Sequence, residues 1–182
     1  MMLKMNPAGL TPLEHRAQSY ATRAHAAVEQ VRKYTGEPYI NHPAAVVELV
    51  RTVPHTPEMI AAAWLHDVVE DTGVELDDIA FHFGPQVAAL VEMLTDVSRP
   101  LDGNRAARKA IDCAHTAQAS PEAKTIKLAD LIDNSKSIMA HDPGFAKTYL
   151  KEKALLLEVL REGNADLWKA AYTYTTITND AQ

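Results

Sequence analysis

The sequence predicts an all-α protein that forms a single domain over residues 1–182. Helix starts led by proline recur along the chain, and no run of residues alternates between polar and apolar side chains as a strand would. A chain of 182 residues is also long enough for one domain with a sizeable core. The proline-led starts are Thr11-Pro12, Thr56-Pro57, Ser120-Pro121 and Asp142-Pro143.

The predicted elements follow from these signals in chain order. Thr11 caps the first helix, and Glu14 completes a capping box with it. Pro38 and Pro43 disfavour helical geometry in the preceding residue, so we expect Glu37 and His42 in extended backbone. A β-rich patch over 171–178 is interpreted as a frayed terminus. The expected helices cover residues 12–33, 43–52, 57–70, 75–83, 85–96, 104–118, 121–139, 143–162 and 165–176.

Composition limits the classes of function. The formal net charge is −6 with the histidines neutral, which argues against nucleic acids and anionic membranes as partners. The single cysteine, Cys113, excludes an intrachain disulfide and a cysteine-based zinc site, and suggests a reducing, cytoplasmic setting. No apolar run approaches the roughly 20 residues of a membrane span, and the first residues resemble no signal peptide. The oligomeric state cannot be read from the sequence.

The stretch AAAWLHDVVEDT, residues 61–72, joins an apolar run to four ionisable side chains. Burying such groups is costly unless they are paired or bind a metal. In one continuous helix, His66 and Glu70 would share a side, as would Asp67 and Asp71. An isolated His-Asp pair is most often a surface contact, but the apolar run and the second pair of acids favour a metal site.

Two further segments strengthen the metal hypothesis. His42 precedes a proline, so the backbone positions it at the mouth of the second helix. Lys127, Asp130, Asn134 and Ser137 form a polar stripe on a helix that is otherwise apolar, which indicates either a polar site or a structural hydrogen-bond network. The other histidines are expected at the surface or in packing: His15, His25, His55, His82, His115 and His141.

The reaction class follows from the chemistry of these side chains. A mixed set of two histidines and two aspartates suits Mn, Fe or Zn better than Ca or Mg, which prefer oxygen ligands. Such an ion can activate water and polarise a phosphoryl oxygen. Glu70 and Asp71 would then orient the water and move protons.

Four segments together resemble the HD superfamily of metal-dependent phosphohydrolases, and in particular the (p)ppGpp hydrolase domain of RelA/SpoT proteins and the small alarmone hydrolases. The resemblance covers most of residues 12–160 and implies an HD-domain helical bundle. It also implies Mn²⁺ held by His42, His66, Asp67 and Asp130, with Glu70 and Asp71 as catalytic residues. The segments are RKYTGEPYINHP (32–43), AAAWLHDVVEDTG (61–73), FGPQVAALVEMLTDVS (83–98) and KTIKLADLIDN (124–134).

The resemblance further implies a small-molecule nucleotide substrate, (p)ppGpp, cleaved to GDP or GTP and pyrophosphate. Arg32 and Lys33 match the pair that lies near the guanine in that family. Asn134 matches the asparagine expected at the sugar or phosphate. Further pocket residues are expected at Ser137, Lys147 and Tyr149.

Two departures from the family pattern concern the nucleotide rather than the metal. The usual ADRLHN reads ADLIDN, with Leu131 and Asp133 in place of Arg and His. The usual GVTKL reads MLTDV, with Asp96 in place of the basic residue, for which Arg99, Arg105 or Arg108 could compensate. Cleavage of (p)ppApp, removal of the 2′-phosphate of NADPH, and nucleotide binding without turnover therefore stay open as alternatives.

Overall fold

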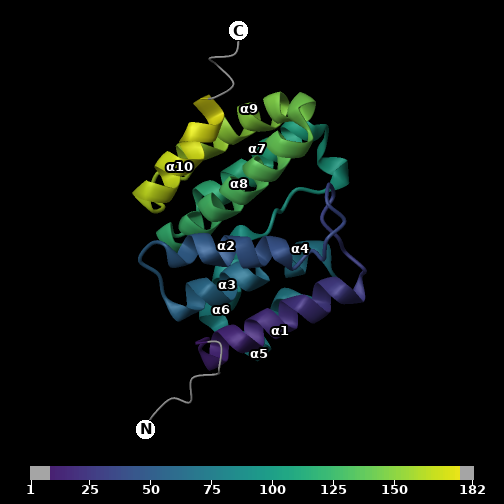
Figure 1. Ribbon diagram of the computed structural model, residues 1–182, viewed down its shortest axis with the longest axis vertical. Helices are drawn as coiled ribbons and strands as arrows, with labels where there is room; N and C mark the ends of the chain where they lie inside the picture. Colours follow the sequence, from purple (N-terminus) through teal and green to yellow (C-terminus); the bar gives the residue numbers. More distant parts are fainter. Residues whose placement is uncertain (1–8, 177–182) are drawn as a thin grey trace. The chain divides into compact units, whose positions relative to one another are not determined.

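The computed structural model describes residues 9–176, and within this range the protein is helical. The described residues contain no strand, only an isolated antiparallel bridge between Val31 and Pro38. The all-α prediction is therefore confirmed (Figure 1). The chain divides into two compact units at Glu92–Met93, and each unit is described by itself. A single domain over 1–182 stays a prediction.

The first unit is organised around a buried central helix, α3 (Pro57–Leu65). Every residue of α3 from Met59 to Leu65 is buried, and the three alanines at 61–63 allow close packing against α1 and α2. Figure 1 shows these helices side by side. The other helices of the unit are α1 (Pro12–Ala27), α2 (Asn41–Arg51), α4 (Val68–Asp71), α5 (Leu76–Phe83) and α6 (Pro85–Leu94), which crosses into the second unit.

The predicted cap at Thr11 forms, but Glu14 has a different role. The Thr11 side chain accepts a hydrogen bond from the backbone N–H of Glu14 at 3.2 Å. The Glu14 side chain is buried, pairs with Arg51 and accepts a hydrogen bond from Trp64 Nε1 at 3.2 Å. Because both partners come from other helices, this carboxylate stabilises their packing in place of the predicted capping box.

Three predicted helix boundaries in this unit are wrong. The first helix ends at Ala27, not near residue 33, because Glu29 has a φ of 52° and the chain turns there. His42 lies inside α2 and not in extended backbone, because Pro43 falls in the first turn, where a missing N–H costs no helical hydrogen bond. The predicted helix 57–70 is interrupted at His66 and Asp67.

The second unit is built around α8 (Pro121–His141), which packs against α9 (Pro143–Val159) and α10 (Ala165–Thr176). The predicted caps form, since Ser120 and Asp142 accept hydrogen bonds from Ala123 N and Phe145 N. The β-rich patch is helical up to Thr176, and its last two residues lie outside the described range. The remaining elements are the 3₁₀ turn η1 (Pro100–Asp102) and α7 (Arg105–Ala117).

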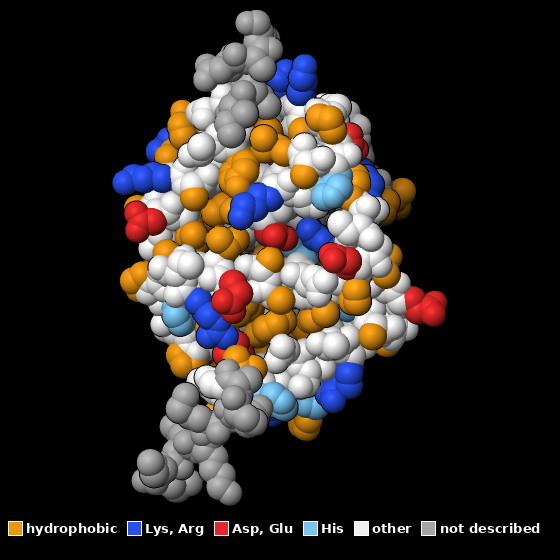
Figure 2. Space-filling model, viewed as in Figure 1, with side chains coloured by type: hydrophobic (Ala, Val, Ile, Leu, Met, Phe, Trp, Pro, Cys, Tyr) orange, Lys and Arg blue, Asp and Glu red, His pale blue; other side chains and the backbone are white. Residues whose placement is uncertain are grey.

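Two properties, charge and hydropathy, can be followed on the described residues. Acidic and basic side chains are interspersed on the face shown in Figure 2. None of the helices between residues 9 and 176 has the length and apolar character to cross a membrane.

Candidate metal centre

His42, His66 and Asp67 form a compact cluster of potential metal ligands in the first unit. One ligand atom from each of the three lies within 4.8 Å of the others. His66 Nε2 lies 3.1 Å from Asp67 Oδ2, and His42 Nε2 lies 3.6 Å from the same oxygen. Both histidines are 1% exposed, whereas Asp67 is only partly buried. The structure thus brings together three of the four predicted ligands.

The break between α3 and α4 positions two of these ligands. His66 Nδ1 lies 2.8 Å from the carbonyl oxygen of Ala63, the acceptor that a continuous helix would offer to the N–H of Asp67. The His66 ring therefore hydrogen-bonds to a carbonyl oxygen that the main chain would otherwise use, and α3 ends at Leu65. Because Nδ1 donates this hydrogen bond, Nε2 keeps its lone pair for the cluster. The prediction of a continuous helix over 57–70 did not include this competition between the His66 side chain and the main chain.

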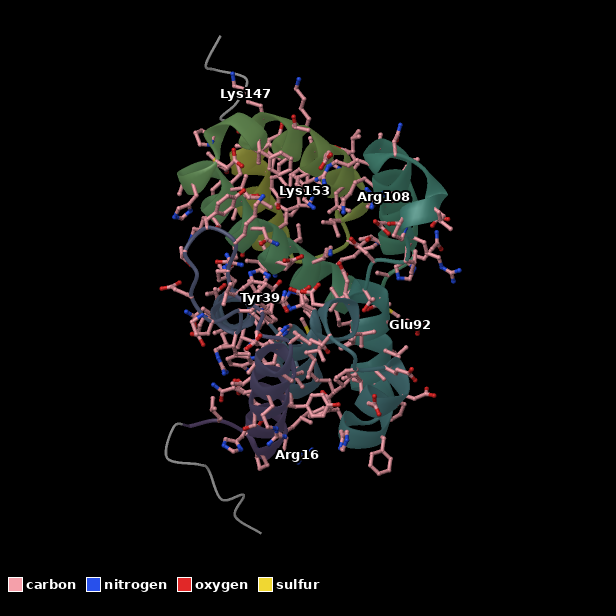
Figure 3. All side chains as sticks on the ribbon, turned by 90° about the vertical axis from the view of Figure 1, so that its right-hand side faces the viewer. Arg16, Tyr39, Glu92, Arg108, Lys147 and Lys153 are labelled. Carbon is pink, nitrogen blue, oxygen red and sulfur yellow. The ribbon has the colours of Figure 1, made fainter. Side chains whose placement is uncertain are left out.

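Tyr39, in the GEPYI segment, contacts the cluster although no role was expected for it. Its hydroxyl donates a hydrogen bond of 2.6 Å to Asp67 Oδ2. Tyr39 lies in the loop that leads into α2 and is labelled in Figure 3. This hydrogen bond orients the carboxylate that both histidines approach.

A second hydrogen-bonded chain reaches Asp71, one of the two predicted catalytic acids. Gln30 Nε2 donates to Asp71 Oδ2 at 2.9 Å, and His25 Nδ1 donates to Gln30 Oε1 at 2.7 Å. Partial desolvation, followed by the charge of Asp67, raises the pKa of Asp71 above its ordinary value, while the hydrogen bond from Gln30 opposes the rise. His25 is buried, as a packing residue would be, and burial lowers its pKa. Glu70 is exposed on α4.

The donor set fits a divalent transition metal. Two imidazoles and a carboxylate are ligand types that such ions use. The Ala63 carbonyl fixes the tautomer of His66, and Tyr39 orients the Asp67 carboxylate, as supporting contacts do at metal sites. A hydrated metal would also neutralise the carboxylates of Asp67 and Asp71, which explains acids at the end of an otherwise apolar segment.

Asp130 and the predicted polar stripe lie on α8 in the second unit. Asp130 is 8% exposed, and its oxygens accept a hydrogen bond of 2.7 Å from Asn134 Nδ2 and lie 3.4 Å from Lys127 Nζ. Asp130 therefore contacts two other members of the stripe, Lys127 and Asn134. The role of Asp130 as a fourth ligand stays a prediction.

The residues expected to bind the nucleotide lie on both units. Arg32 and Lys33 occupy a tight turn that Gly36 closes, with a φ of 71°. Lys33 Nζ lies 5.1 Å from the centre of the Tyr34 ring. In the second unit, Ser137 is partly buried on α8 and Lys147 is exposed on α9.

Tyr149, the last of the expected pocket residues, is buried on α9 and lies close to Ser135. Burial, followed by the charge of Asp130, raises the pKa of its hydroxyl above the ordinary value. Its contribution to nucleotide binding stays a prediction, as do those of Arg32, Lys33, Asn134, Ser137 and Lys147.

Asp96, which replaces the family's basic residue, is paired with lysines. Lys109 Nζ lies 3.3 Å from Asp96, and Lys127 Nζ lies 4.0 Å from it. Arg105, one of the arginines expected to compensate, instead donates two hydrogen bonds to Glu152, at 2.7 and 2.8 Å. Leu131, which replaces the family's arginine, is 2% exposed and belongs to the core of α8.

Comparison with known proteins agrees with this geometry. The chain is 38% identical over 125 residues to human guanosine-3′,5′-bis(diphosphate) 3′-pyrophosphohydrolase MESH1, covering 67% of each protein. It is 37% identical over 131 residues to a probable enzyme of the same name from Synechocystis, covering 70% of this chain but 17% of that relative. The chain therefore spans about two thirds of the human relative and less than a fifth of the cyanobacterial one.

A solved structure matches nearly the whole chain, with a TM-score of 0.81 and 28% identity over 94% of this chain and 98% of the other. It is described as a metazoan ortholog of SpoT that hydrolyses ppGpp and plays a role in starvation responses. The HD-domain family matches residues 17–156, which include all four predicted ligands. The chain therefore belongs to the HD-domain family.

Proposed function

We propose that this chain is a metal-dependent guanosine-3′,5′-bis(diphosphate) 3′-pyrophosphohydrolase that cleaves (p)ppGpp to GDP or GTP and pyrophosphate. The observation that carries the proposal is the cluster of His42, His66 and Asp67, in a chain that is 38% identical to human MESH1 over 67% of its length. The proposed setting is cytoplasmic, as the single cysteine suggests.

His42, His66 and Asp67 would hold the metal ion, with Asp130 as the proposed fourth ligand and Mn²⁺ as the proposed ion. When bound, a divalent ion lowers the pKa of water and stabilises negative charge that develops on phosphoryl oxygens. The mixture of nitrogen and oxygen donors supports Mn²⁺ over Mg²⁺. It does not favour Mn²⁺ over Fe²⁺ or Zn²⁺, so the metal is best identified by elemental analysis.

Asp71 is the proposed general base. Its raised pKa makes it a better proton acceptor than an ordinary carboxylate, and Gln30 holds its Oδ2 atom in place. Asp71 would take a proton from the water as its oxygen bonds to phosphorus. The bond between phosphorus and the 3′-oxygen would break, and the departing 3′-oxygen would take a proton from solvent to become the 3′-hydroxyl. Glu70, exposed in the same short helix, would orient that water.

The proposed contacts to the nucleotide are the residues that the family resemblance implies. Arg32 and Lys33 form a basic turn suited to stacking on the guanine and to contacting phosphate. Asn134, Ser137, Lys147 and Tyr149 are the proposed contacts from α8 and α9. Leu131 and Asp133 remove a positive charge and add a negative one beside this set, so (p)ppApp and NADPH belong in the same assay.

The experiment compares purified chain loaded with Mn²⁺ on ppGpp, ppApp and NADPH, with products separated by anion-exchange chromatography. Equal amounts of GDP and pyrophosphate from ppGpp are expected, and Asp67→Ala should abolish them. Asp77→Ala, which removes an exposed aspartate of α5, is the matched control. Cleavage of only ppApp or NADPH would reassign the substrate, and binding of ppGpp without cleavage would indicate a nucleotide-binding domain.

A further inference from the structure

The second unit contains a cavity of about 480 Å³ between α7, α8 and α9, and the proposed reaction assigns it no role. Its walls are mainly small or apolar side chains from α7 and α9. This volume is within the range of about 300–1,000 Å³ that is usual for small-molecule sites, which combine apolar walls with a few placed polar groups. The walls include Ala106, Ala110, Cys113, Leu155, Leu156 and Val159.

The acidic groups on the cavity wall are already engaged. Asp112 accepts hydrogen bonds from the N–H groups of Val97 and Ser98 and from the Ser98 hydroxyl, at 3.0, 2.8 and 2.8 Å. Glu152 accepts both of its hydrogen bonds from Arg105. Asp96 faces two lysines, as described above. Among the described residues, each carboxylate on the cavity wall therefore already has a hydrogen-bond or ion-pair partner.

Three lysines line the cavity, and Lys153 differs from the other two. Lys109 and Lys127 lie within 4.0 Å of Asp96, and Lys127 also lies near Asp130. Within residues 9–176, Lys153 has no ion pair or hydrogen bond of its own, and its nearest partner is the Tyr149 ring, 5.0 Å from Nζ. Figure 3 labels Lys153 among the helices of this unit.

We propose that this cavity binds a small monoanion with an apolar body, such as a short-chain carboxylate, with the Lys153 ammonium as its anchor. The anion would give Lys153 the partner that the wall lacks, and the apolar body would contact the alanine, leucine and valine side chains. None of the described wall residues is a proposed metal ligand, catalytic residue or nucleotide contact, so the inference does not rest on the proposed hydrolase activity.

The surroundings of Lys153 make the pairing favourable near neutral pH. Burial, followed by the charge of Lys127, lowers the pKa of Lys153 to about 8, against opposing contributions from Asp130 and Asp96. Lys109 on α7 lowers it further. A bound anion favours the ammonium form, so binding should be tighter at pH 7 than at pH 9.

The only cysteine of the chain lies on the cavity wall, so its thiol reports occupancy directly. The experiment measures the rate at which N-ethylmaleimide modifies Cys113 in the full chain, with octanoate or with octan-1-ol at the same concentration. Octanoate is expected to slow modification at least fivefold, and octan-1-ol much less. Because the readout is thiol chemistry, a failed hydrolase assay would not affect it.

Matched variants on α9 test whether the protection of Cys113 depends on the charge of Lys153. Lys153→Met keeps an unbranched side chain only one heavy atom shorter, removes the charge, and should abolish protection by octanoate. Lys153→Arg should retain the protection. Lys151→Met removes an exposed lysine two residues away and should behave as the wild type does. Equal protection by octanoate and octan-1-ol, undiminished protection in Lys153→Met, or no protection at all would each overturn the proposal.

Discussion

Replacing Gln30 with leucine tests whether the Gln30–Asp71 hydrogen bond positions the general base. The substitution removes the 2.9 Å hydrogen bond to Asp71 Oδ2 and keeps an apolar side chain of similar size. A hydrogen bond of this kind contributes about 1–1.5 kcal/mol, at the modest end because Asp71 is exposed. If it is needed in the transition state, kcat should fall about 5- to 12-fold with KM little changed.

The pH profile separates positioning from a general loss of structure. Because the Gln30 hydrogen bond lowers the pKa of Asp71, its loss raises that pKa further. If Asp71 acts as a base, the acidic limb of the kcat profile for ppGpp hydrolysis should move to higher pH in Gln30→Leu. Glu29→Gln, at the neighbouring exposed residue, is the control. An unchanged kcat and acidic limb in a folded Gln30→Leu protein would show that Gln30 does not position Asp71.

Two hydrogen-bonded side chains, Tyr39 and Asp112, and the buried His25 can each be tested by one substitution. Tyr39→Phe removes the 2.6 Å hydrogen bond to Asp67 and should weaken Mn²⁺ binding about 10- to 100-fold in a calorimetric titration; unchanged affinity would contradict this role. Asp112→Ala strands two backbone N–H groups and should lower the free energy of unfolding in urea by about 2–3 kcal/mol, and a loss below about 0.5 kcal/mol would count against it. The lowered pKa of His25 means that the unfolded chain binds more protons below about pH 6.5, so stability falls as the pH decreases. His25→Gln should therefore lose less unfolding free energy between pH 7 and pH 5, as measured in urea, and an equal loss would exclude this contribution.

The sequence correctly predicted the features that depend on residues close to one another in the chain. A helix cap such as Thr11 or Ser120 accepts a hydrogen bond from the backbone N–H of the residue three positions later in the chain. Both caps form. The apolar run before His66 correctly predicted a buried helix. These features depend on neighbours in the chain, which a sequence displays directly.

The remaining features depend on contacts that no local pattern reveals. Gln30 and Asp71 are 41 residues apart, and Arg105 and Glu152 are 47 apart. The break in the helix at His66 depends on its ring reaching the carbonyl oxygen of Ala63, an interaction that helix periodicity does not encode. The GEPYI motif offers a signal for Tyr39, since a carboxylate that binds a metal is usually hydrogen-bonded and Tyr39 is the hydroxyl donor of this motif.

Binding of a divalent metal ion by His42, His66 and Asp67 is the foundation of the proposed function. Its most direct test is the number of Mn²⁺ ions bound per chain, measured from the electron paramagnetic resonance signal of free Mn²⁺ during a titration. One tightly bound ion is expected for the wild type and for Asp77→Ala, and none for Asp67→Ala over the same concentrations. Equal tight binding by a folded Asp67→Ala protein would contradict the claim.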